Sequence, residues 1–277
     1  MHIVVCVKQV PDTTEVKIDP RTNTIIREGV PSIMNPYDTH AVEEAVLIKE
    51  KYGGTVSVIS MGPPQAKDVL KKAIGMGADR AILVSDRAFA GSDTLATSYV
   101  LAKAIERLSR EHKIDLIFCG MQAIDGDTAQ VGPGIASRLG FTQLTYVKKV
   151  EWVDPEKGEI QVVRKLEDCA EVIIAKMPAV ITTVKELNRL RYSLLGNMIT
   201  AEKYDVSMWG KSELAADDAC LGLKGSPTNV ARIFAPPERI GGEIIPGGVE
   251  NPGEAVKLLV DKILNNKLFV NDYTVRR

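Results

Sequence analysis

Residues 120–132, Gly-Met-Gln-Ala-Ile-Asp-Gly-Asp-Thr-Ala-Gln-Val-Gly, lie between a predicted buried strand and a predicted helix. Asp127 is suited to cap that helix, and Gln130, three residues later, is suited to reach back in a capping-box arrangement. The free amides and the dipole at the helix start would favour a phosphate group. The segment therefore predicts an anion-binding loop, and a plain capped loop is the alternative that spacing alone leaves open.

A second helix start has a similar design. Asn35 is a good N-cap residue, Pro36 fits the first helical position, and Asp38 falls in the opening turn. Taken alone, these residues indicate ordinary capping. The expected topology favours a ligand-binding role in addition, because Asn35, the strand end at Met61 and the loop at Asp125 should meet in one crevice at the carboxyl edge of the parallel sheet.

The motifs of common nucleotide enzymes and metal sites are missing from the sequence. It contains no GxGxxG after a strand, no GxxxxGK[ST] and no GxSxG. The four cysteines form no CxxC pair and the three histidines have no metal-ligand spacing, so we expect no metal and no catalytic residue. Glu43 and Glu44 are neighbours on one predicted helix and diverge around its axis, so we expect both to be solvated.

The elements that must position these residues alternate between strand and helix. Apolar runs predict strands at 2–10, 56–61, 81–84 and 114–119, and apolar residues at helical spacing predict helices at 37–51, 66–75, 95–111 and 129–139. This alternation predicts an α/β fold with a mostly parallel sheet and helices on both faces, of the Rossmann-like kind that binds adenine nucleotides. Residues 15–19 and 24–27 predict a hairpin.

The style of the sequence changes after residue 139. Residues 144–153, 159–165 and 172–176 predict an antiparallel meander, and the unbroken apolar run 178–184 predicts another central strand. From residue 185 the sequence shows no regular alternation of strands and helices, and it contains one last run with apolar residues at helical spacing. We therefore predict a nucleotide-binding domain over 1–184 and an extended C-terminal arm over 185–277 that packs on a partner subunit.

Composition narrows the classes of partner. The chain has 277 residues, 35 Lys plus Arg against 36 Asp plus Glu, and a formal net charge of -1. Such a balance offers no basic field for nucleic acid or an anionic membrane. The sequence has neither a signal-like leader nor an uninterrupted apolar spanning stretch, so a cytoplasmic protein is expected.

Four blocks of sequence resemble the beta subunit of electron-transfer flavoproteins. They are residues 34–37 (Met-Asn-Pro-Tyr), 41–45 (Ala-Val-Glu-Glu-Ala), 75–80 (Gly-Met-Gly-Ala-Asp-Arg) and 122–125 (Gln-Ala-Ile-Asp), and the match runs from residue 2 to about 198. The resemblance implies a partner alpha subunit with a redox FAD, and an adenine nucleotide held by the beta subunit. That nucleotide is AMP in most members.

In the electron-bifurcating branch of this family the nucleotide is a second FAD. There it takes a hydride from NADH and divides the electrons between the alpha-subunit FAD, which leads to an acyl-CoA-type dehydrogenase, and a low-potential acceptor such as ferredoxin or flavodoxin. The AMP-type loop resembles Ala-Ile-Asp-Asp-Asp-Cys-Asn-Gln-Thr, whereas residues 123–131 read Ala-Ile-Asp-Gly-Asp-Thr-Ala-Gln-Val. The smaller Gly126 and Ala129 favour FAD, with AMP as the alternative.

The same resemblance assigns two sets of residues. The arm at 187–198 looks like the loop by which the family docks on its dehydrogenase, although Leu190 and Gly196 stand where members often have prolines. Docking residues would be Tyr192, Leu194 and Leu195. Nucleotide-binding residues would be Cys6, Asn35, Asp38, Met61, Ala123, Asp125, Gly126, Asp127, Thr128, Ala129, Gln130 and Val131.

Two other classes of protein compete with this interpretation. An ATP-splitting ligase-type domain would need a glycine- and serine-rich loop after the first strand, where residues 7–12 read Val-Lys-Gln-Val-Pro-Asp. A nucleotide-binding module without a redox role, resembling universal stress proteins, would not need the long arm after residue 185. The arm therefore favours the electron carrier over the module.

Overall fold

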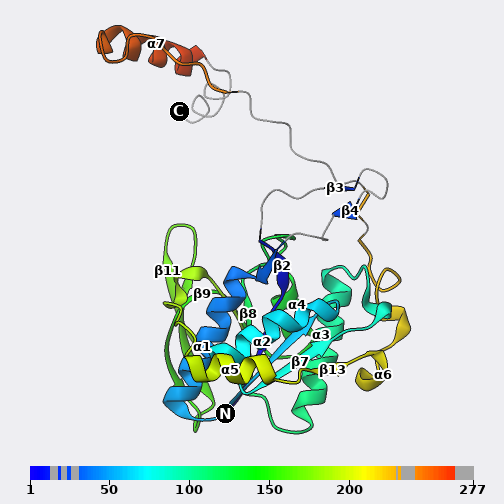
Figure 1. The fold of residues 1–277 in the computed structure, drawn as a ribbon. Coiled ribbons are helices and arrows are strands. Elements are labelled where there is room, and N and C mark those ends of the chain that lie inside the picture. The colour runs from blue at the N-terminus through cyan, green and yellow to red at the C-terminus, as the bar shows by residue number, and fades with distance from the viewer. Residues whose placement is uncertain (13–17, 20–23, 26–30, 229, 232–240, 266–277) are drawn as a thin grey trace, which may run out of the picture. The chain divides into compact units, whose positions relative to one another are not determined.

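The computed structural model describes residues 1–12, 18–19, 24–25, 31–228, 230–231 and 241–265. The chain divides into two compact units, residues 1–233 and 234–277. The first unit contains a nine-stranded sheet with the strand order β11-β10-β9-β12-β8-β1-β6-β7-β13 (Figure 1). Among the described residues of the second unit, α7 (Pro252–Asn265) is helical.

The central strands of the sheet are parallel, as the sequence predicts. The strands β9, β12, β8, β1, β6, β7 and β13 run in one direction. Every residue of β1 is buried, because a parallel strand is covered on both faces, and its residues after His2 are accordingly apolar. The bounds are β1 (His2–Cys6), β6 (Thr55–Met61), β7 (Arg80–Val84), β8 (Leu116–Gly120), β9 (Thr142–Asp154), β12 (Ala179–Thr183) and β13 (Ser207–Trp209).

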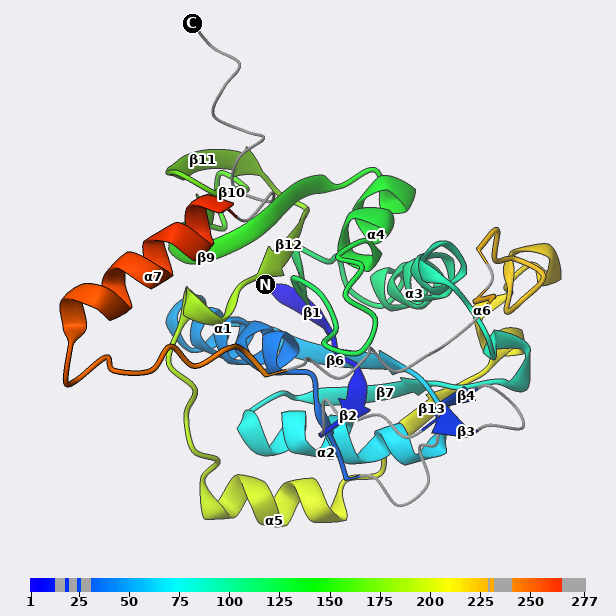
Figure 2. The same ribbon diagram turned by 90° about the horizontal axis from the view of Figure 1, so that it is seen from above.

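Helices cover both faces of this sheet (Figure 2). On one face α1 (Pro36–Tyr52) and α2 (Lys67–Met76) pack against alternate strand residues such as Ile3 and Val5. On the other face α3 (Thr94–Ser109) and α4 (Val131–Leu139) pack against the intervening residues such as Val4. The predicted α/β class with helices on both faces is therefore confirmed.

The predicted meander is present at one end of the sheet. The long strand β9 pairs antiparallel with β10 (Glu159–Lys165), and β10 pairs antiparallel with β11 (Ala170–Lys176). The first residues of β9 also pair parallel with β12. The apolar run at 178–184 forms β12, which lies between β8 and β9 as the predicted central strand.

The amino-terminal strand is shorter than the sequence predicts. It ends at Cys6, and residues 9–11 form the separate strand β2 (Gln9–Pro11), which pairs with β5 (Ser32–Met34). Pro11 cannot donate to a central ladder, which suits it to this small two-stranded ribbon. Of the predicted hairpin, β3 (Ile18–Asp19) and β4 (Thr24–Ile25) pair antiparallel, and its other residues lie outside the described residues.

The arm after residue 184 returns to the sheet instead of leaving it. Following the short turn η3 (Lys185–Leu187), helix α5 (Leu195–Lys203) packs on the outer side of α2, and β13 pairs with β7. The helix α6 (Lys211–Leu214) and the turn η4 (Asp218–Cys220) follow. Two further turns, η1 (Pro64–Ala66) and η2 (Arg87–Phe89), complete the described elements. Packing of the arm on a partner subunit stays a prediction.

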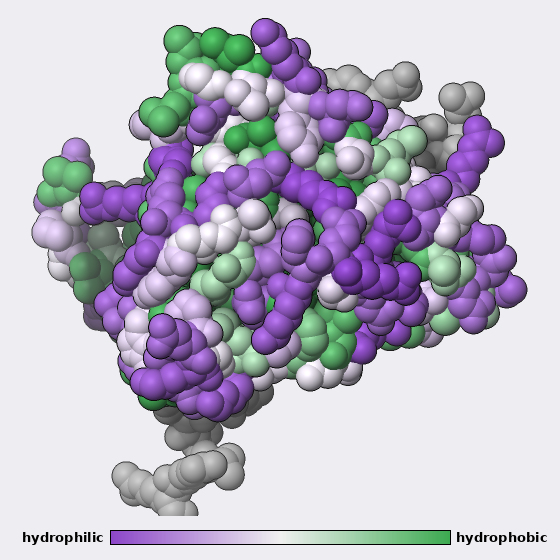
Figure 3. Space-filling view, turned by 90° about the horizontal axis from the view of Figure 1, so that it is seen from below, coloured by the Kyte–Doolittle hydropathy of each residue, from purple (hydrophilic) through white to green (hydrophobic). Residues whose placement is uncertain are grey.

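One edge of the sheet can be followed in the space-filling view. At the amino ends of the parallel strands the surface is mostly hydrophilic, with apolar side chains in small separate groups (Figure 3). No helix among the described residues combines the length and apolarity that crossing a bilayer requires. The polar side chains singled out by the sequence lie at the opposite, carboxyl edge.

Candidate nucleotide-binding site

The carboxyl ends of β1 and β8 form the topological switch point of the sheet. From β1 the chain proceeds to β6 and β7 on one side, and it later returns to place β8 on the other side of β1. Ligands of open α/β sheets bind outside such a point. The start of α1 and the loop at 121–130, which follows β8, both lie at this edge of the sheet (Figure 1).

Asp38 ties the two strand ends together. Its Oδ2 accepts a hydrogen bond from the Lys8 main-chain amide at 2.7 Å, and its Oδ1 accepts from the Gly120 amide at 3.1 Å and from Asn35 Nδ2 at 2.8 Å. Burial raises the pKa of this carboxyl to about 7, although all three hydrogen bonds act to lower it. Asp38 thus lies buried at the floor of the crevice that is expected at this edge of the sheet.

Asn35 precedes α1 as predicted, but its side chain does not cap the helix. The Asp38 and Thr39 amides already donate to the Asn35 carbonyl oxygen, at 2.9 and 3.1 Å. The side chain instead reaches the loop after β8, where Nδ2 donates to the Gln122 carbonyl at 2.9 Å and Oδ1 accepts from the Ile124 amide at 3.2 Å. Asn35 therefore joins α1 to the candidate phosphate loop.

The predicted capping box between Asp127 and Gln130 is absent, because α4 begins only at Val131. Asp127 and Ala129 have φ angles of 55° and 54°, in the left-handed region that a right-handed helix cannot contain. The Asp127 carboxylate accepts from Gln122 Nε2 instead, and Gln130 Oε1 accepts from Thr94 Oγ1 at 2.8 Å. The loop is thereby held in a defined shape ahead of the helix.

Main-chain amides of residues 128–132 remain available on this loop. Within the described part of the chain they have no acceptor. A run of such amides at a helix start is the usual protein site for a phosphate group. Ala123 and Thr128 lie on the same loop, and Ala123 accepts hydrogen bonds from the amides of Gly126 and Asp127.

Two glycines at this edge permit contacts that any side chain would prevent. A Cβ atom on Gly120 would lie 2.2 Å from Asp38 Oδ1 and 2.7 Å from Tyr37 Cβ, and one on Gly132 would lie 2.5 Å from Thr182 Cγ2. A Cβ atom on Gly126 would meet nothing within 4 Å. The sequence analysis includes Gly120 in the segment 120–132 but assigns it no role, although a glycine at the end of a strand and before a functional loop is a recognisable signal.

Lys8 is a second residue that the sequence analysis missed. Its Nζ donates to both carboxylate oxygens of Asp125, at 2.7 and 2.8 Å, and so links the segment after β1 to the loop. Cys6 is buried at the end of β1, in register with Cys119 on β8. The hydrogen bond with Cys6, together with burial, raises the pKa of the Cys119 thiol. Met61 ends the neighbouring strand β6.

The predicted docking residues form an exposed apolar segment. Tyr192 is 94% exposed, Leu194 71% and Leu195 73%. Met198 and Ile199, on the first turns of α5, are also more than half exposed. Several exposed apolar side chains thus lie together in the segment expected to meet a partner.

Glu43 and Glu44 correct the sequence analysis, which expected them to be solvated. Both are buried, because the arm crosses α1 and brings Arg191 and Asn188 onto them. Arg191 donates to Glu43, and Asn188 Nδ2 donates to Glu44 Oε2 at 2.9 Å. Their burial follows from partners almost 150 positions away, which adjacent sequence does not reveal.

The comparisons with known proteins agree on one family. Residues 22–212 match the model of the electron transfer flavoprotein domain. The chain is 52% identical over 264 residues to the electron transfer flavoprotein subunit beta of Clostridium acetobutylicum, with 95% of this chain and 98% of the relative covered. It is 50% identical over 240 residues to protein FixA of Azotobacter vinelandii, with 86% and 85% covered.

A further relative belongs to a named assembly. The caffeyl-CoA reductase-Etf complex subunit CarD of Acetobacterium woodii is 48% identical over 264 residues, with 95% of this chain and 98% of the relative covered. Identity at this level across nearly the whole of both chains implies the same fold.

Proposed function

Because this chain belongs to the electron transfer flavoprotein beta subunit family, we propose that its crevice beside loop 121–130 holds FAD and that it works in a heterodimer with an alpha subunit. When bound, this FAD would accept a hydride from NADH and supply electrons both to the alpha-subunit FAD and to a low-potential acceptor such as ferredoxin or flavodoxin. The alpha-subunit FAD leads to an acyl-CoA-type dehydrogenase. AMP in the same crevice, without bifurcation, is the alternative.

The observation that carries the proposal is the open phosphate loop. The free amides of residues 128–132 suit a diphosphate, and the space beside Gly126 suits a ligand larger than AMP. The Thr128 hydroxyl and Gln130 Nε2 are further donors for phosphate oxygens, and the Asp127 carboxylate can accept from a sugar hydroxyl. The residues of the chain bind and orient the ligand, and none is assigned a proton-transfer role.

The names of the relatives support a carrier that works with a CoA-ester enzyme. The CarD protein is named a subunit of a caffeyl-CoA reductase-Etf complex, which pairs an electron transfer flavoprotein with a CoA-ester reductase. By extension, we propose an alpha subunit and a dehydrogenase of the acyl-CoA type as partners of this chain. The exposed segment 192–199 is the proposed docking surface for the dehydrogenase, with Tyr192, Leu194 and Leu195 as its anchors.

The cofactor content of the heterodimer tests the proposal directly. The chain is co-purified with its alpha subunit, the complex is denatured, and the released FAD and AMP are quantified per heterodimer. We expect two FAD and no AMP per heterodimer. One FAD together with one AMP would identify a conventional carrier and overturn the interpretation of Gly126 and Ala129.

Restoring the AMP-type side chains should lower the affinity for FAD. The double variant Gly126→Asp/Ala129→Asn adds a carboxylate beside the proposed diphosphate and fills the open space. We expect FAD binding to weaken by about tenfold or more, which corresponds to about 1.4 kcal/mol, while AMP binding is retained. Fluorescence titration of the FAD-depleted complex with FAD, and calorimetry with AMP, measure the two affinities.

Both substitutions are compatible with the backbone, so a loss of FAD would not reflect misfolding. Position 126 has space for a side chain, and asparagine tolerates the left-handed conformation that Ala129 already adopts. Gly126→Ala is the matched control, since it adds one methyl group and no charge. If the double variant binds FAD as tightly as this control, the two small residues do not select the nucleotide.

A further inference from the structure

The arm after β12 crosses α1 before its apolar segment 192–199 begins. Asn188 makes the first attachment to this helix. Its Oδ1 lies 2.9 Å from His40 Nδ1, and because an amide oxygen only accepts, this imidazole nitrogen carries the proton. Its Nδ2 donates to the His40 carbonyl at 3.0 Å and to Glu44 Oε2 at 2.9 Å. All the hydrogen-bonding atoms of one short side chain are thus used to hold the arm.

Arg191 makes the second attachment and is the last residue before the exposed segment. Its Nε donates to Glu43 Oε1 at 2.9 Å, and its two terminal nitrogens donate to the two oxygens of Glu50 at 2.6 and 3.0 Å. The Glu43 side chain is only 3% exposed. The two carboxylates, Glu50 first, raise the pKa of Arg191, so its guanidinium remains charged. We call Glu43, Glu50, Asn188 and Arg191 the clamp.

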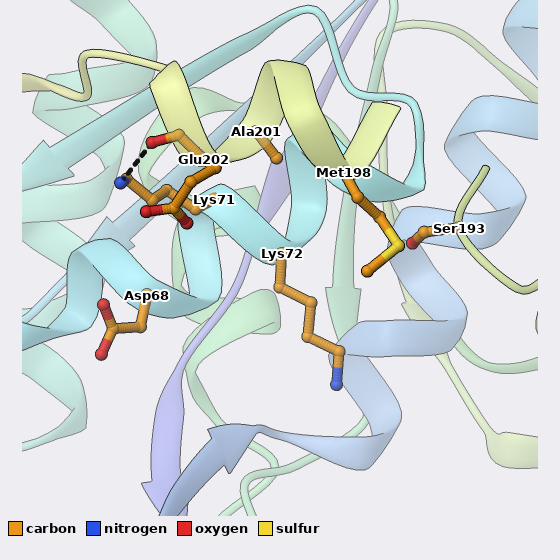
Figure 4. A pocket seen from close by; sticks show the side chains of 8 residues that line it. Asp68, Lys71, Lys72, Ser193, Met198, Ala201 and Glu202 are labelled. Carbon is orange, nitrogen blue, oxygen red and sulfur yellow. Dashed lines mark hydrogen bonds between the residues drawn. The ribbon is translucent and has the colours of Figure 1, made fainter. Parts of the chain in front are cut away.

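The far end of the apolar segment is attached to α2 and β7. Lys71 Nζ donates to the Glu202 carbonyl at 2.8 Å, and the Tyr204 hydroxyl accepts from the Ala81 amide at 3.1 Å. Ala201 is buried on α2, close to Gly75. A hollow of about 320 Å³ lies between α2 and α5, and Ser193, Met198, Ala201 and Glu202 are among the residues that line it. Figure 4 shows Met198 and Ser193 at one side of it.

The stretch between the two attachments is apolar and exposed. A loop of this kind loses conformational freedom when it docks, and holding it in place beforehand reduces that loss. Burying the Glu43 charge beside Arg191 is a poor way to gain stability, because an apolar pair of similar size would serve as well. The fork geometry of arginine does fix the direction in which the following residues leave α1.

We propose that the clamp positions the segment 192–199 for docking, with Arg191 as the positioning residue. This inference rests on the proposed function, in which that segment meets the acyl-CoA-type dehydrogenase. Arg191 itself faces α1 and is not assigned a contact with the partner. Its loss should therefore act on the affinity of the complex for the dehydrogenase and not on electron transfer once the partners are docked.

The test uses the intact alpha–beta complex and two variants of the clamp. Arg191→Gln alone leaves Glu43 buried and unpaired, so the double variant Glu43→Gln/Arg191→Gln is made as well, since it removes both charges and keeps similar volumes. Steady-state rates are measured against an acyl-CoA-type dehydrogenase with which the unaltered complex gives saturable turnover. Hydrogen exchange of residues 188–199 is measured without the dehydrogenase.

We expect both variants to raise the KM for the dehydrogenase about tenfold, with kcat changed less than twofold. Exchange of the 188–199 amides should be faster by a similar factor, while the exchange of α4 and the nucleotide content stay unchanged. Arg191→Lys keeps the charge but loses the fork, so its KM and its exchange rate should lie between those of the two variants and those of the unaltered complex. Arg189→Gln is the matched control, because Arg189 is exposed on the same arm and has no ion pair among the described residues.

Three results would overturn the inference. They are an unchanged KM in the double variant, an increase equal to that of Arg189→Gln, or a raised KM without faster exchange, which would mean that Arg191 contacts the partner itself. Failure of the proposed docking surface is recognised separately, because Leu195→Ala would then leave the KM unchanged while the clamp variants still show faster exchange.

Discussion

Replacing Gly120 by alanine is expected to lower the free energy of unfolding by about 3 kcal/mol or more, at the upper end of what overpacking costs. The new methyl group would lie 2.2 Å from Asp38 Oδ1 and 2.9 Å from the Asp38 amide. Neither atom can move away freely, since the carboxylate is fixed by Lys8 and Asn35 and the amide belongs to the first turn of α1. Relief of the clash must separate β8 from α1.

Denaturant unfolding of the nucleotide-free chain measures this loss without a contribution from ligand binding. Gly126→Ala is the matched control, six residues later in the loop that follows β8. Its added methyl group meets no atom within 4 Å, so a change of less than about 0.5 kcal/mol is expected. Equal losses in the two variants would show that glycine content matters at this edge and that the contact between Gly120 and Asp38 does not.

The general architecture could be predicted from the sequence because it depends on patterns within each segment. A strand buried on both faces is mostly apolar, as β1 is after His2, and a covering helix must place apolar residues every three or four positions, as α2 and α3 do. The return of the arm to the sheet through β13 follows no such pattern, because three residues are too few to show periodicity.

The candidate site was predicted less completely, because its decisive contacts join residues far apart in the chain. The sequence indicated Asn35 and Asp38 as residues of a helix start, and both do stand there. The partners that give them their actual roles, Gly120 and Gln122, lie more than 80 positions later. Spacing shows what a side chain can reach along its own helix, and it does not show what the fold brings to it.

A capping box also needs more than the right residues at the right spacing. Asp127 and Gln130 satisfy the pattern, yet the helix they should begin starts after them. The loop instead accepts left-handed backbone at two residues that have side chains, a conformation that usually marks a constrained and functional segment. The local rule failed here at the place where we propose that a ligand binds, as is common for functional sites.

Asp38 should make the stability of the fold depend on pH in a direction opposite to that of most carboxylates. Its pKa rises from the ordinary 3.8 to about 7 on folding, so the folded state binds the proton more tightly than the unfolded state. The stabilisation from the protonated form is complete below about pH 4 and is lost as the pH rises through about 7. The difference corresponds to on the order of 4 kcal/mol.

Asp38→Asn removes the titrating carboxyl group but introduces an unfavourable contact between two hydrogen-bond donors. An amide in place of the carboxyl can still accept from Gly120 and Asn35, but its NH₂ group then faces the Lys8 amide, and two donors cannot pair. We therefore expect the variant to be less stable than the unaltered chain by about 2 kcal/mol at pH 5. The deficit should shrink or reverse at pH 8.5, where the unaltered chain carries a buried charge.

Unfolding free energies of the Asp38→Asn variant and the unaltered chain, measured at pH 5 and pH 8.5, test whether Asp38 titrates, and Asp125→Asn is the control. Asp125 is the other carboxylate linked to the Lys8 segment, but its pair is with the half-exposed Nζ, so its loss should cost no more than about 1 kcal/mol at either pH. A deficit of the Asp38 variant that is the same at pH 5 and pH 8.5 would mean that Asp38 does not titrate in this range. The three donors would then outweigh burial, and the crevice floor would carry a permanent negative charge, which would disfavour a diphosphate near it.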